Sequence, residues 1–266
     1  MKMCNVFSVM AAVLLCVSCS FIKVNGHGAD APISTFSDVS IEFDQPVKNG
    51  SIVAGKNFIS RDFTVEEFTE ISCNIPSDIY YSIGPASLSI SAPDNVMDHI
   101  KVSVRNGKLD IRFDIKNVRR ANDIKVVVSS SALSALEING AGDFYSNDAL
   151  VSDDFTINAN GASDISISSL EANEVSVNVN GAGDVDFDML KAVEASICIN
   201  GAGDADIEKL DCGFVKVEVN GAGDCSLEGR ADKASLAIHG VGDIDIEDLA
   251  CTDVNSSVQG IGRVER

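Results

Sequence analysis

The sequence predicts an all-β protein, a parallel β-solenoid whose two-strand coils each take up about 20 residues. A five-residue segment, first seen as Asn139-Gly140-Ala141-Gly142-Asp143, returns along the chain at steps of 21, 20, 20, 20, 19 and 20 residues. Between these segments, apolar and polar residues alternate with the period of a β-strand. Equivalent positions of successive units carry similar side chains, which stacked coils require.

Each repeat unit is predicted to contain a strand, a bend, a second strand and a glycine turn. In one unit, Val185 and Phe187 lie on the first strand, Leu190 marks the bend, and Ile197 and Ile199 lie on the second strand. We expect the turn glycines to supply positive φ angles, and the flanking Asn and Asp side chains to bond nearby backbone amides. The turn glycines are Gly140, Gly142, Gly161, Gly181, Gly183, Gly201, Gly203, Gly221, Gly223, Gly240 and Gly242.

An antiparallel meander is the alternative arrangement of these strands, since Asn-Gly is also a hairpin signal. A meander, however, does not place like residues beside like. Parallel coils stacked about 4.8 Å apart do, and they bury one continuous aliphatic core. In the solenoid, Cys225 points inward, Cys212 and Cys251 take the slot of Ala172 and Ala192, and Cys198 points outward.

The beginning of the chain is predicted to direct export. Residues 1–18 read as a lipoprotein signal peptide, with an apolar run from Val6 to Val17 that is too short to span a bilayer. A small residue followed by Cys resembles a lipobox and makes Cys19 the lipidated N-terminus; cleavage at Cys16 or ordinary secretion are the alternatives. We therefore expect a cell-envelope lipoprotein of the outer membrane, on its surface or its periplasmic face.

The front of the mature chain is predicted to lead into the repeats. Residues 19–57 form a tether and an N-terminal strand segment, 58–128 form a cap or the first coils, and 129–266 form the Gly-x-Gly-Asp repeats. Lys101 to Arg105 and Lys108 to Phe113 alternate apolar and polar residues. Asn106-Gly107 between them predicts a hairpin turn.

The charge and cysteine content exclude some classes of protein. A net charge of −20, from 40 acidic and 20 basic residues, argues against nucleic-acid binding because such a surface repels phosphates. A zinc site is not expected because the sequence has no Cys-x-x-Cys and its three histidines are scattered. The cysteines after Cys19 are expected to be free and mostly buried thiols, with a disulfide as the alternative.

One aspartate of each turn would form an acidic ladder, with a partial second row at Asp186, Asp206 and Asp245. Neighbouring carboxylates would repel, so backbone amide bonds and solvent must offset them, or calcium must bind. No cofactor is required. The aspartates of the ladder are expected to cap the turns or to bind a cation. They are Asp143, Asp164, Asp184, Asp204, Asp224 and Asp243.

Catalysis finds little support in the sequence. Acid/base chemistry needs two groups with separated pKa values, whereas Asp186 and Asp206 recur as part of a row. Lys216 is the one distinct cation, and its equivalents in other units are serines. Nucleophile and nucleotide motifs are absent. Phe144-Tyr145 at the first turn is expected to cap an edge, or alternatively to contact a ligand.

Taken together, these features resemble the head GIN domain family of auto-transporter adhesins, which occurs in many Bacteroidetes. The resemblance covers roughly Phe58 to Arg266. It is carried by the Arg61-x-Phe63 opening, the Asn106-Gly107-Lys108-Leu109-Asp110-Ile111 hairpin and the serial Gly-Ala-Gly-Asp turns. It implies a right-handed β-superhelix similar to pectin-lyase-like folds, without an identified catalytic set.

The function expected from the resemblance is non-catalytic cell adhesion, in which solenoid faces bind a glycan or protein ligand and a lipid anchor holds the chain to the membrane. The first alternative is a structural or envelope-assembly protein of the periplasm. The second is a carbohydrate-active enzyme with the pectin-lyase-like fold.

Overall fold

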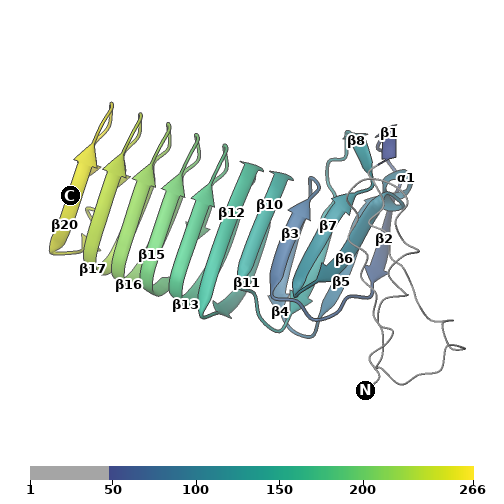
Figure 1. The fold of residues 1–266 in the computed structure, drawn as a ribbon, viewed down its shortest axis with the longest axis horizontal. Helices are drawn as coiled ribbons and strands as arrows, with labels where there is room; N and C mark the ends of the chain where they lie inside the picture. The colour runs from purple at the N-terminus through teal and green to yellow at the C-terminus, as the bar shows by residue number, and fades with distance from the viewer. Residues whose placement is uncertain (1–47) are drawn as a thin grey trace, which may run out of the picture. The chain divides into compact units, whose positions relative to one another are not determined.

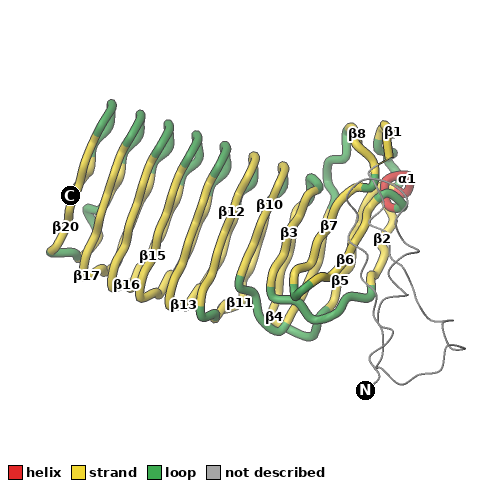
Figure 2. Tube along the Cα trace, in the orientation of Figure 1, coloured by secondary structure: helices red, strands yellow, loops and turns green. Residues whose placement is uncertain are grey.

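The computed structural model describes residues 48–266, most of which lie in β-strands (Figures 1 and 2). The predicted signal peptide, Cys19 and most of the predicted tether therefore lie outside the described residues. Among the described residues there is one short helix, α1 (Asp94–Met97). The strands are β1 (Lys48–Val53), β2 (Phe58–Phe63), β3 (Glu70–Asn74), β4 (Asp78–Ile83), β5 (Ser87–Pro93), β6 (Ile100–Arg105), β7 (Lys108–Phe113), β8 (Ile115–Arg119), β9 (Lys125–Ser130), β10 (Ala135–Ala141), β11 (Phe144–Val151), β12 (Asp154–Ala162), β13 (Ile165–Val179), β14 (Val185–Phe187), β15 (Leu190–Ile199), β16 (Ala205–Val219), β17 (Cys225–Ile238), β18 (Ile244–Asp245), β19 (Leu249–Ala250), β20 (Asp253–Val258) and β21 (Val264–Glu265).

From β10 onward the strands form coils that stack in register, as Figure 1 shows. Leu170 pairs with Leu190, which pairs in turn with Leu210, so equivalent residues lie side by side at a step of 20. The pairings of β13, β15, β16 and β17 with one another are all parallel. The predicted parallel β-solenoid is confirmed, and the antiparallel meander is excluded for the repeats.

The inward side chains of successive coils form one aliphatic core. Val177, Ile197 and Val217 occupy one inward row and are each at most 1% exposed. Burial of such a row removes apolar surface from water at every coil, which stabilises the stack by roughly 25 cal/mol per Å². The alternation of buried and exposed residues along β16 and β17 is the predicted strand period.

The cysteines lie where the predicted register places them. Cys225 and Cys212 are buried, and Cys212 pairs with Ala192 on the preceding coil. Cys198 is half-buried on an outward position, and Cys251 follows Ala250 into the row of Cys212. All five cysteines of the described residues are free thiols, as predicted.

The coil made by β3 and β4 is not stacked in chain order. β3 pairs with β10 on one side and with β7 on the other, and β4 pairs in the same way with β11 and β9. Residues 70–83 therefore lie between a coil from 108–130 and a coil from 135–151. After β4 the chain forms the coil of β7 and β9 on one side of the β3–β4 coil. It then crosses to the other side, where β10 and β11 begin the repeats.

Antiparallel strands cover the N-terminal end of the stack. β5 pairs with β9, β2 pairs with β5, and β6 pairs with β7. The predicted hairpin turn between β6 and β7 is confirmed: Asn106 and Gly107 have φ angles of 53° and 78°, the left-handed pair of a tight hairpin. Beside this cap, β1 pairs in parallel with β8. The antiparallel order interrupts the like-over-like stacking of the repeats.

The last coil replaces two inward apolar residues by polar ones. Ser256 pairs with Leu236, and Arg266 follows Glu265, which pairs with Asp245. The Arg266 Nη2 donates to Ser256 Oγ at 2.8 Å. A polar contact thus occupies two positions where the preceding coil carries the buried apolar residues Leu236 and Ile246.

Candidate ligand-binding faces

The turn glycines lie where successive coils approach most closely. The N–H of Ala202 donates to the Gly181 carbonyl oxygen at 2.8 Å, and the N–H of Ala222 donates to that of Gly201 at 2.7 Å. A Cβ on Gly201 would overlap the Gly181 carbonyl oxygen, and every later turn glycine meets its preceding coil in the same way. A side chain at the first glycine of these turns would overlap the backbone of the preceding coil, whereas the second position accepts the small Ser163 in one turn.

The turns were predicted to need glycine for its positive φ angles, but most of them need it because the coils approach so closely. Among the turn glycines that the structure describes, positive φ angles occur at Gly142 (138°), Gly161 (156°) and Gly260 (154°), and not at Gly181, Gly201 or their neighbours. Gly140 is looser, because its nearest contact is the Ile75 backbone at 3.7 Å. The turns therefore need glycine mainly for space between coils, and the rarer left-handed backbone is secondary.

The asparagines that open the turns bond to one another, not to backbone amides as predicted. Asn200 Nδ2 donates to Asn180 Oδ1 at 3.0 Å, and Asn220 Nδ2 donates to Asn200 Oδ1 at the same distance. The ladder begins at Asn74, which accepts from Asn139 at 2.8 Å, and it runs unbroken to Asn220. Each amide both donates and accepts, so every inner member of the row has a partner on both neighbouring coils.

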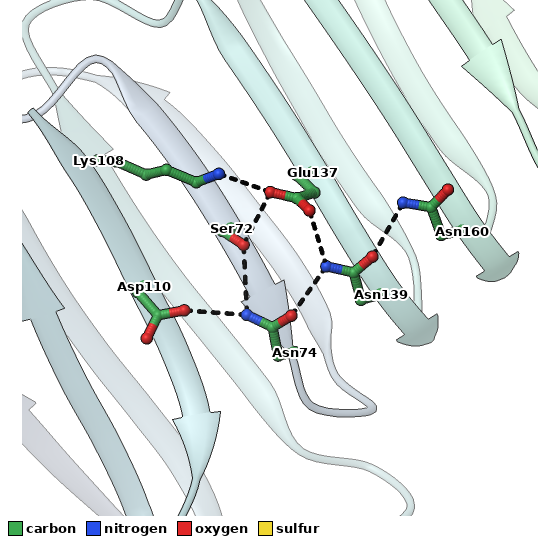
Figure 3. A network of polar contacts seen from close by, with 7 residues as sticks. All are labelled: Ser72, Asn74, Lys108, Asp110, Glu137, Asn139 and Asn160. Carbon is green, nitrogen blue, oxygen red and sulfur yellow. Dashed lines mark hydrogen bonds and ion pairs between the residues drawn. The ribbon is translucent and has the colours of Figure 1, made fainter. Parts of the chain in front are cut away.

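At its first end the ladder joins a polar network that binds three coils together (Figure 3). Glu137 accepts from Lys108 at 2.6 Å and from Ser72 at 3.1 Å, and Asn74 donates to Asp110 at 2.9 Å. The hydrogen bond from Lys108 is the main reason that the pKa of Glu137 lies below its usual range. Burial instead raises the pKa of Asp110. The network fixes the out-of-order β3 strand between β7 and β10.

The predicted acidic ladder is present, and its carboxylates bond between coils. The N–H of Asp224 donates to Asp204 Oδ1 at 2.8 Å, and the N–H of Asp204 donates to Asp184 Oδ1 at 2.9 Å. The same bond joins the other turns from Asp78 to Arg263 at 2.7–3.4 Å. The prediction placed these amide bonds near each aspartate, whereas each carboxylate caps the turn of the next coil. These hydrogen bonds offset part of the repulsion along the row.

The ladder gives calcium no ready-made cage. Within residues 48–266, no group of three or more His, Cys, Asp or Glu side chains is arranged to hold a metal ion. One oxygen of each ladder carboxylate already accepts a backbone N–H. At the last turn, Arg263 replaces aspartate, and its Nη2 lies 3.6 Å from Asp243 Oδ2.

One turn of the ladder was not predicted from the sequence. Asn74-Ile75-Pro76-Ser77-Asp78 occupies the place of a glycine turn, because Asn139 donates to Asn74 and the N–H of Asp143 approaches Asp78 Oδ1 at 3.4 Å. Its signal was the spacing of Asn and Asp alone, without either glycine. It also lies 65 residues before its partner, far from the period of 20.

The first strands of the later coils form an acidic face. Asp186 pairs in register with Asp206, and burial, then neighbouring carboxylates, raises the pKa of both groups. A hollow of about 300 Å³ lies on this face beside Asp206 and Asp245. The acidic face comprises Asp184, Asp186, Asp188, Asp204, Asp206, Glu208, Asp224, Glu228, Asp243 and Asp245.

Lys216 lies on the other side of the coils and does not join these carboxylates. It pairs in register with Ser196 and Ser235, as predicted, and its Nζ lies 2.8 Å from Glu218 Oε1. The Asp186–Asp206 pair therefore remains part of a repeated row, without Lys216 as a partner.

A groove follows the bend between the two strands of each coil. Its wall alternates in charge through Glu171, Lys191, Asp211 and Arg230, which pair in register. Lys191 lies 2.6 Å from Glu171, and Arg230 lies 2.7 Å from Asp211. The groove holds about 490 Å³. Two ion pairs cross its wall, whereas the lining as a whole, with Asp153 and Asp232 added, remains acidic.

The predicted pair Phe144-Tyr145 divides between core and surface. Phe144 is fully buried and stacks against Tyr81 with ring centroids 6.1 Å apart. Tyr145 points outward, and its hydroxyl donates to Asp143 at 2.9 Å. The pair therefore does not act as one edge cap, and Tyr145 alone is available to a ligand.

Comparison with known proteins identifies the family. Residues 67–188 and 184–265 match the family described as "Putative auto-transporter adhesin, head GIN domain". These two segments cover well over half of the chain. The chain belongs to the head GIN domain family. The resemblance carried by the hairpin and the glycine turns is confirmed.

Solved structures share this head GIN fold. The structure of a putative adhesin from Bacteroides fragilis is 27% identical, with a TM-score of 0.71, over 81% of this chain and 99% of that one. A putative adhesin from Parabacteroides distasonis is 21% identical, with a TM-score of 0.67, over 81% and 99% of the two chains. A putative lipid binding protein from the same species is 18% identical, with a TM-score of 0.60, over 81% and 100%.

No curated protein matches the chain. None of the helical structure described in residues 48–266 is long and apolar enough to cross a bilayer.

Proposed function

We propose that this head GIN protein is a non-catalytic adhesin of the bacterial cell envelope, which binds its ligand through the outward faces of the solenoid. The observation that carries the proposal is the register of the outward side chains. Because Asp186 lies beside Asp206, and Ser176 beside Ser196, each row continues from coil to coil. Such rows form broad faces suited to extended partners, as in other solenoids.

The family and its solved members support adhesion as the role of these faces. The putative adhesin from Bacteroides fragilis shares 27% identity over nearly its whole length. The family description also names an adhesin. A glycan or a protein is the proposed ligand, and the net charge of −20 disfavours nucleic acid and other polyanions.

The proposed attachment to the envelope is a lipid on Cys19, after removal of residues 1–18. The apolar run before Cys19 and the small residue next to it support this proposal. Replacement of Cys19 by Ala should release the protein from the membrane fraction, and mass spectrometry of the wild-type N-terminal peptide should show the acyl chains. An unmodified N-terminal peptide would contradict the lipid anchor.

The proposed absence of catalysis is supported by the repetition of the carboxylates. A hydrolase needs an acid and a base in different environments, but the pKa values of Asp186 and Asp206 are raised by the same cause, burial. Incubation with plant, animal and bacterial polysaccharides should release no new reducing or unsaturated ends. Product formation that is lost in Asp206→Asn would establish the enzyme instead.

Adhesion is tested in cells. A strain that lacks the gene should adhere less to mucus-coated or epithelial surfaces than the parent, and the wild-type gene should restore adhesion. Protease treatment of intact cells should remove the protein if it is displayed at the surface. Full protection from protease, with unchanged adhesion, would favour the periplasmic structural role.

A further inference from the structure

All three tyrosines of the chain lie at one place in the fold. Tyr80 on β4 pairs in register with Tyr145 on β11, and their rings stack with centroids 5.4 Å apart and planes 20° from parallel. Tyr81, the next residue along β4, points into the core. The two outward rings lie at the end of the solenoid face whose later coils carry the acidic face.

The stacked rings belong to a row that crosses neighbouring strands. On one side of Tyr80 lies Val127 of β9, which is 55% exposed, and Tyr80 itself is 40% exposed. On the other side of Tyr145 lies Ser166 of β13, followed by Asp186. The row therefore changes from apolar and aromatic to small and then to acidic. We call Val127, Tyr80 and Tyr145 the tyrosine platform.

The spacing beside Tyr145 suits a ring-shaped ligand. Because Ser166 ends at its Oγ, it is too short to cover that face of the half-buried Tyr145 ring as Tyr80 covers the other face. Asp186 lies two strands from Tyr145, which is roughly 10 Å along the stack. A ligand ring packed about 4 Å above the aromatic face would leave about 6 Å to the Asp186 strand. A hydroxyl group fits in that interval and can donate to the carboxylate.

The orientation of the platform is held by the protein itself. The Tyr145 hydroxyl donates to Asp143 Oδ2 at 2.9 Å, so the phenol is tied to the acidic ladder. Tyr80 packs on its other face. The ring is thus fixed before a ligand arrives, and binding would cost little side-chain entropy.

We infer that the tyrosine platform binds an uncharged sugar ring of a glycan, with its C–H face on Tyr145 and its hydroxyls on Asp186; this inference rests on the proposed adhesin function. A pyranose combines the two surfaces that the row presents, an apolar face and hydroxyl donors. Sialylated and uronic sugars are disfavoured, because Asp143, Asp164 and Asp186 would repel their carboxylates.

A cationic peptide is the competing ligand, because a lysine or arginine side chain could lie over Tyr145 and pair with the carboxylates. The dependence of binding on ionic strength distinguishes a cationic peptide from an uncharged sugar. Binding of a peptide to this face should weaken steeply between low and physiological ionic strength, whereas binding of an uncharged sugar should not.

The test is a glycan array carrying uncharged, amino and sialylated glycans, probed with the full chain. Uncharged glycans should bind and sialylated ones should not. The glycan that binds on the array is then titrated into the protein while tyrosine fluorescence is recorded. The chain has no Trp, and all three tyrosines lie at or beneath the platform. Tyr145→Ala should weaken binding about tenfold, and Tyr145→Phe should keep most of it because the stacking ring remains.

Val53→Ala is the control, because Val53 is 44% exposed but lies on β1, which pairs with β8 beside the cap and outside the candidate ligand-binding faces. It should bind as the wild type does. Circular dichroism of each variant confirms that the fold is retained. The inference is overturned if no uncharged glycan binds, if Tyr145→Ala binds the glycan as Val53→Ala does, or if Tyr145→Ala abolishes salt-sensitive binding of a decalysine peptide and leaves glycan binding unchanged.

The failure of this site can be told apart from the failure of the adhesin function. If cells carrying Tyr145→Ala adhere as wild-type cells do, while the deletion strain does not, adhesion stands and the platform is not its site. If the deletion strain adheres normally, the adhesin function falls whatever the array shows.

Discussion

A single methyl group in a central turn should destabilise the whole stack. In Gly201→Ala the new Cβ would overlap the Gly181 carbonyl oxygen, so the two turns must move apart. That movement disrupts the bond from Ala202 N–H to Gly181 (2.8 Å), from Asn200 to Asn180 (3.0 Å) and from Asp204 N–H to Asp184 (2.9 Å).

The magnitude follows from these contacts. Three hydrogen bonds at about 1 kcal/mol each contribute about 3 kcal/mol. Overpacking strain adds roughly 1–3 kcal/mol. The expected loss is about 4–6 kcal/mol, a large part of the 5–15 kcal/mol typical of a folded protein.

Gly84→Ala is the matched control for this prediction. At Gly84 a Cβ would meet only the Ser129 side chain, at 3.8 Å, which is ordinary van der Waals contact. We expect a change within about 0.5 kcal/mol. Urea unfolding followed by far-ultraviolet circular dichroism measures both variants. Equal stability of the two, or a loss below about 1 kcal/mol in Gly201→Ala, would refute the close-approach explanation.

Four further predictions follow from the ladders and the platform. Asn180→Asp removes the donor to Asn160 and should lower the free energy of unfolding by about 1–2 kcal/mol, whereas the outward Ser196→Ala should change it little in the same urea titration. The hydrogen bond to Asp143 raises the pKa of Tyr145 to about 12 from its usual 10; because the folded state then holds the proton more tightly, stability should fall as the pH rises from 10 to 12, and this fall should shrink in Tyr145→Phe. Burial raises the pKa of Asp206, so Asp206→Asn should stabilise the protein at pH 7 by about 0.5 kcal/mol after solvent screening, with the gain lost once acid protonates the wild-type carboxyl; a destabilised variant at pH 7 would contradict this. Since each ladder carboxylate accepts a backbone N–H, a chelator should shift the melting temperature by less than about 1 °C, and a shift of several degrees would instead indicate structural calcium.

The repeats could be predicted because their signal is local and serial. The period of 20 and the alternation around residues such as Val177 and Ile197 report an inward row directly, and the structure places them side by side. The slots of Cys212 and Cys225 follow from the same alignment. Register, burial and strand type are thus properties of one unit repeated.

The order of the first coils could not be predicted, because it depends on contacts far apart in sequence. β3 meets β10 at a separation of 65 residues, and its turn has lost both glycines. Nothing in residues 70–83 alone indicates that the chain builds a cap before it continues on the other side.

The contacts of the candidate site could be predicted only in part, because they too depend on pairing between coils. The sequence shows which residues recur, but not whether Asn180 and Asp184 bond within their own turn or to the next coil. Likewise, Tyr80 and Tyr145 are 65 residues apart, and only the pairing of β4 with β11 brings their rings together.

Register between adjacent coils is the central claim, and the native Cys198 tests it directly. Asn178 and Glu218 flank Cys198 in register on the neighbouring coils. Ser176 pairs with Ser196 instead, so it lies two residues away along the neighbouring strand. Adjacent strands lie within the Cα distance of about 4.4–6.8 Å that a disulfide requires. Mild oxidation should therefore cross-link Cys198 to the new thiol in Asn178→Cys and in Glu218→Cys, but not in Ser176→Cys, as read by peptide mass spectrometry. Absence of both cross-links, or an equal yield in Ser176→Cys, would contradict parallel stacking of like over like.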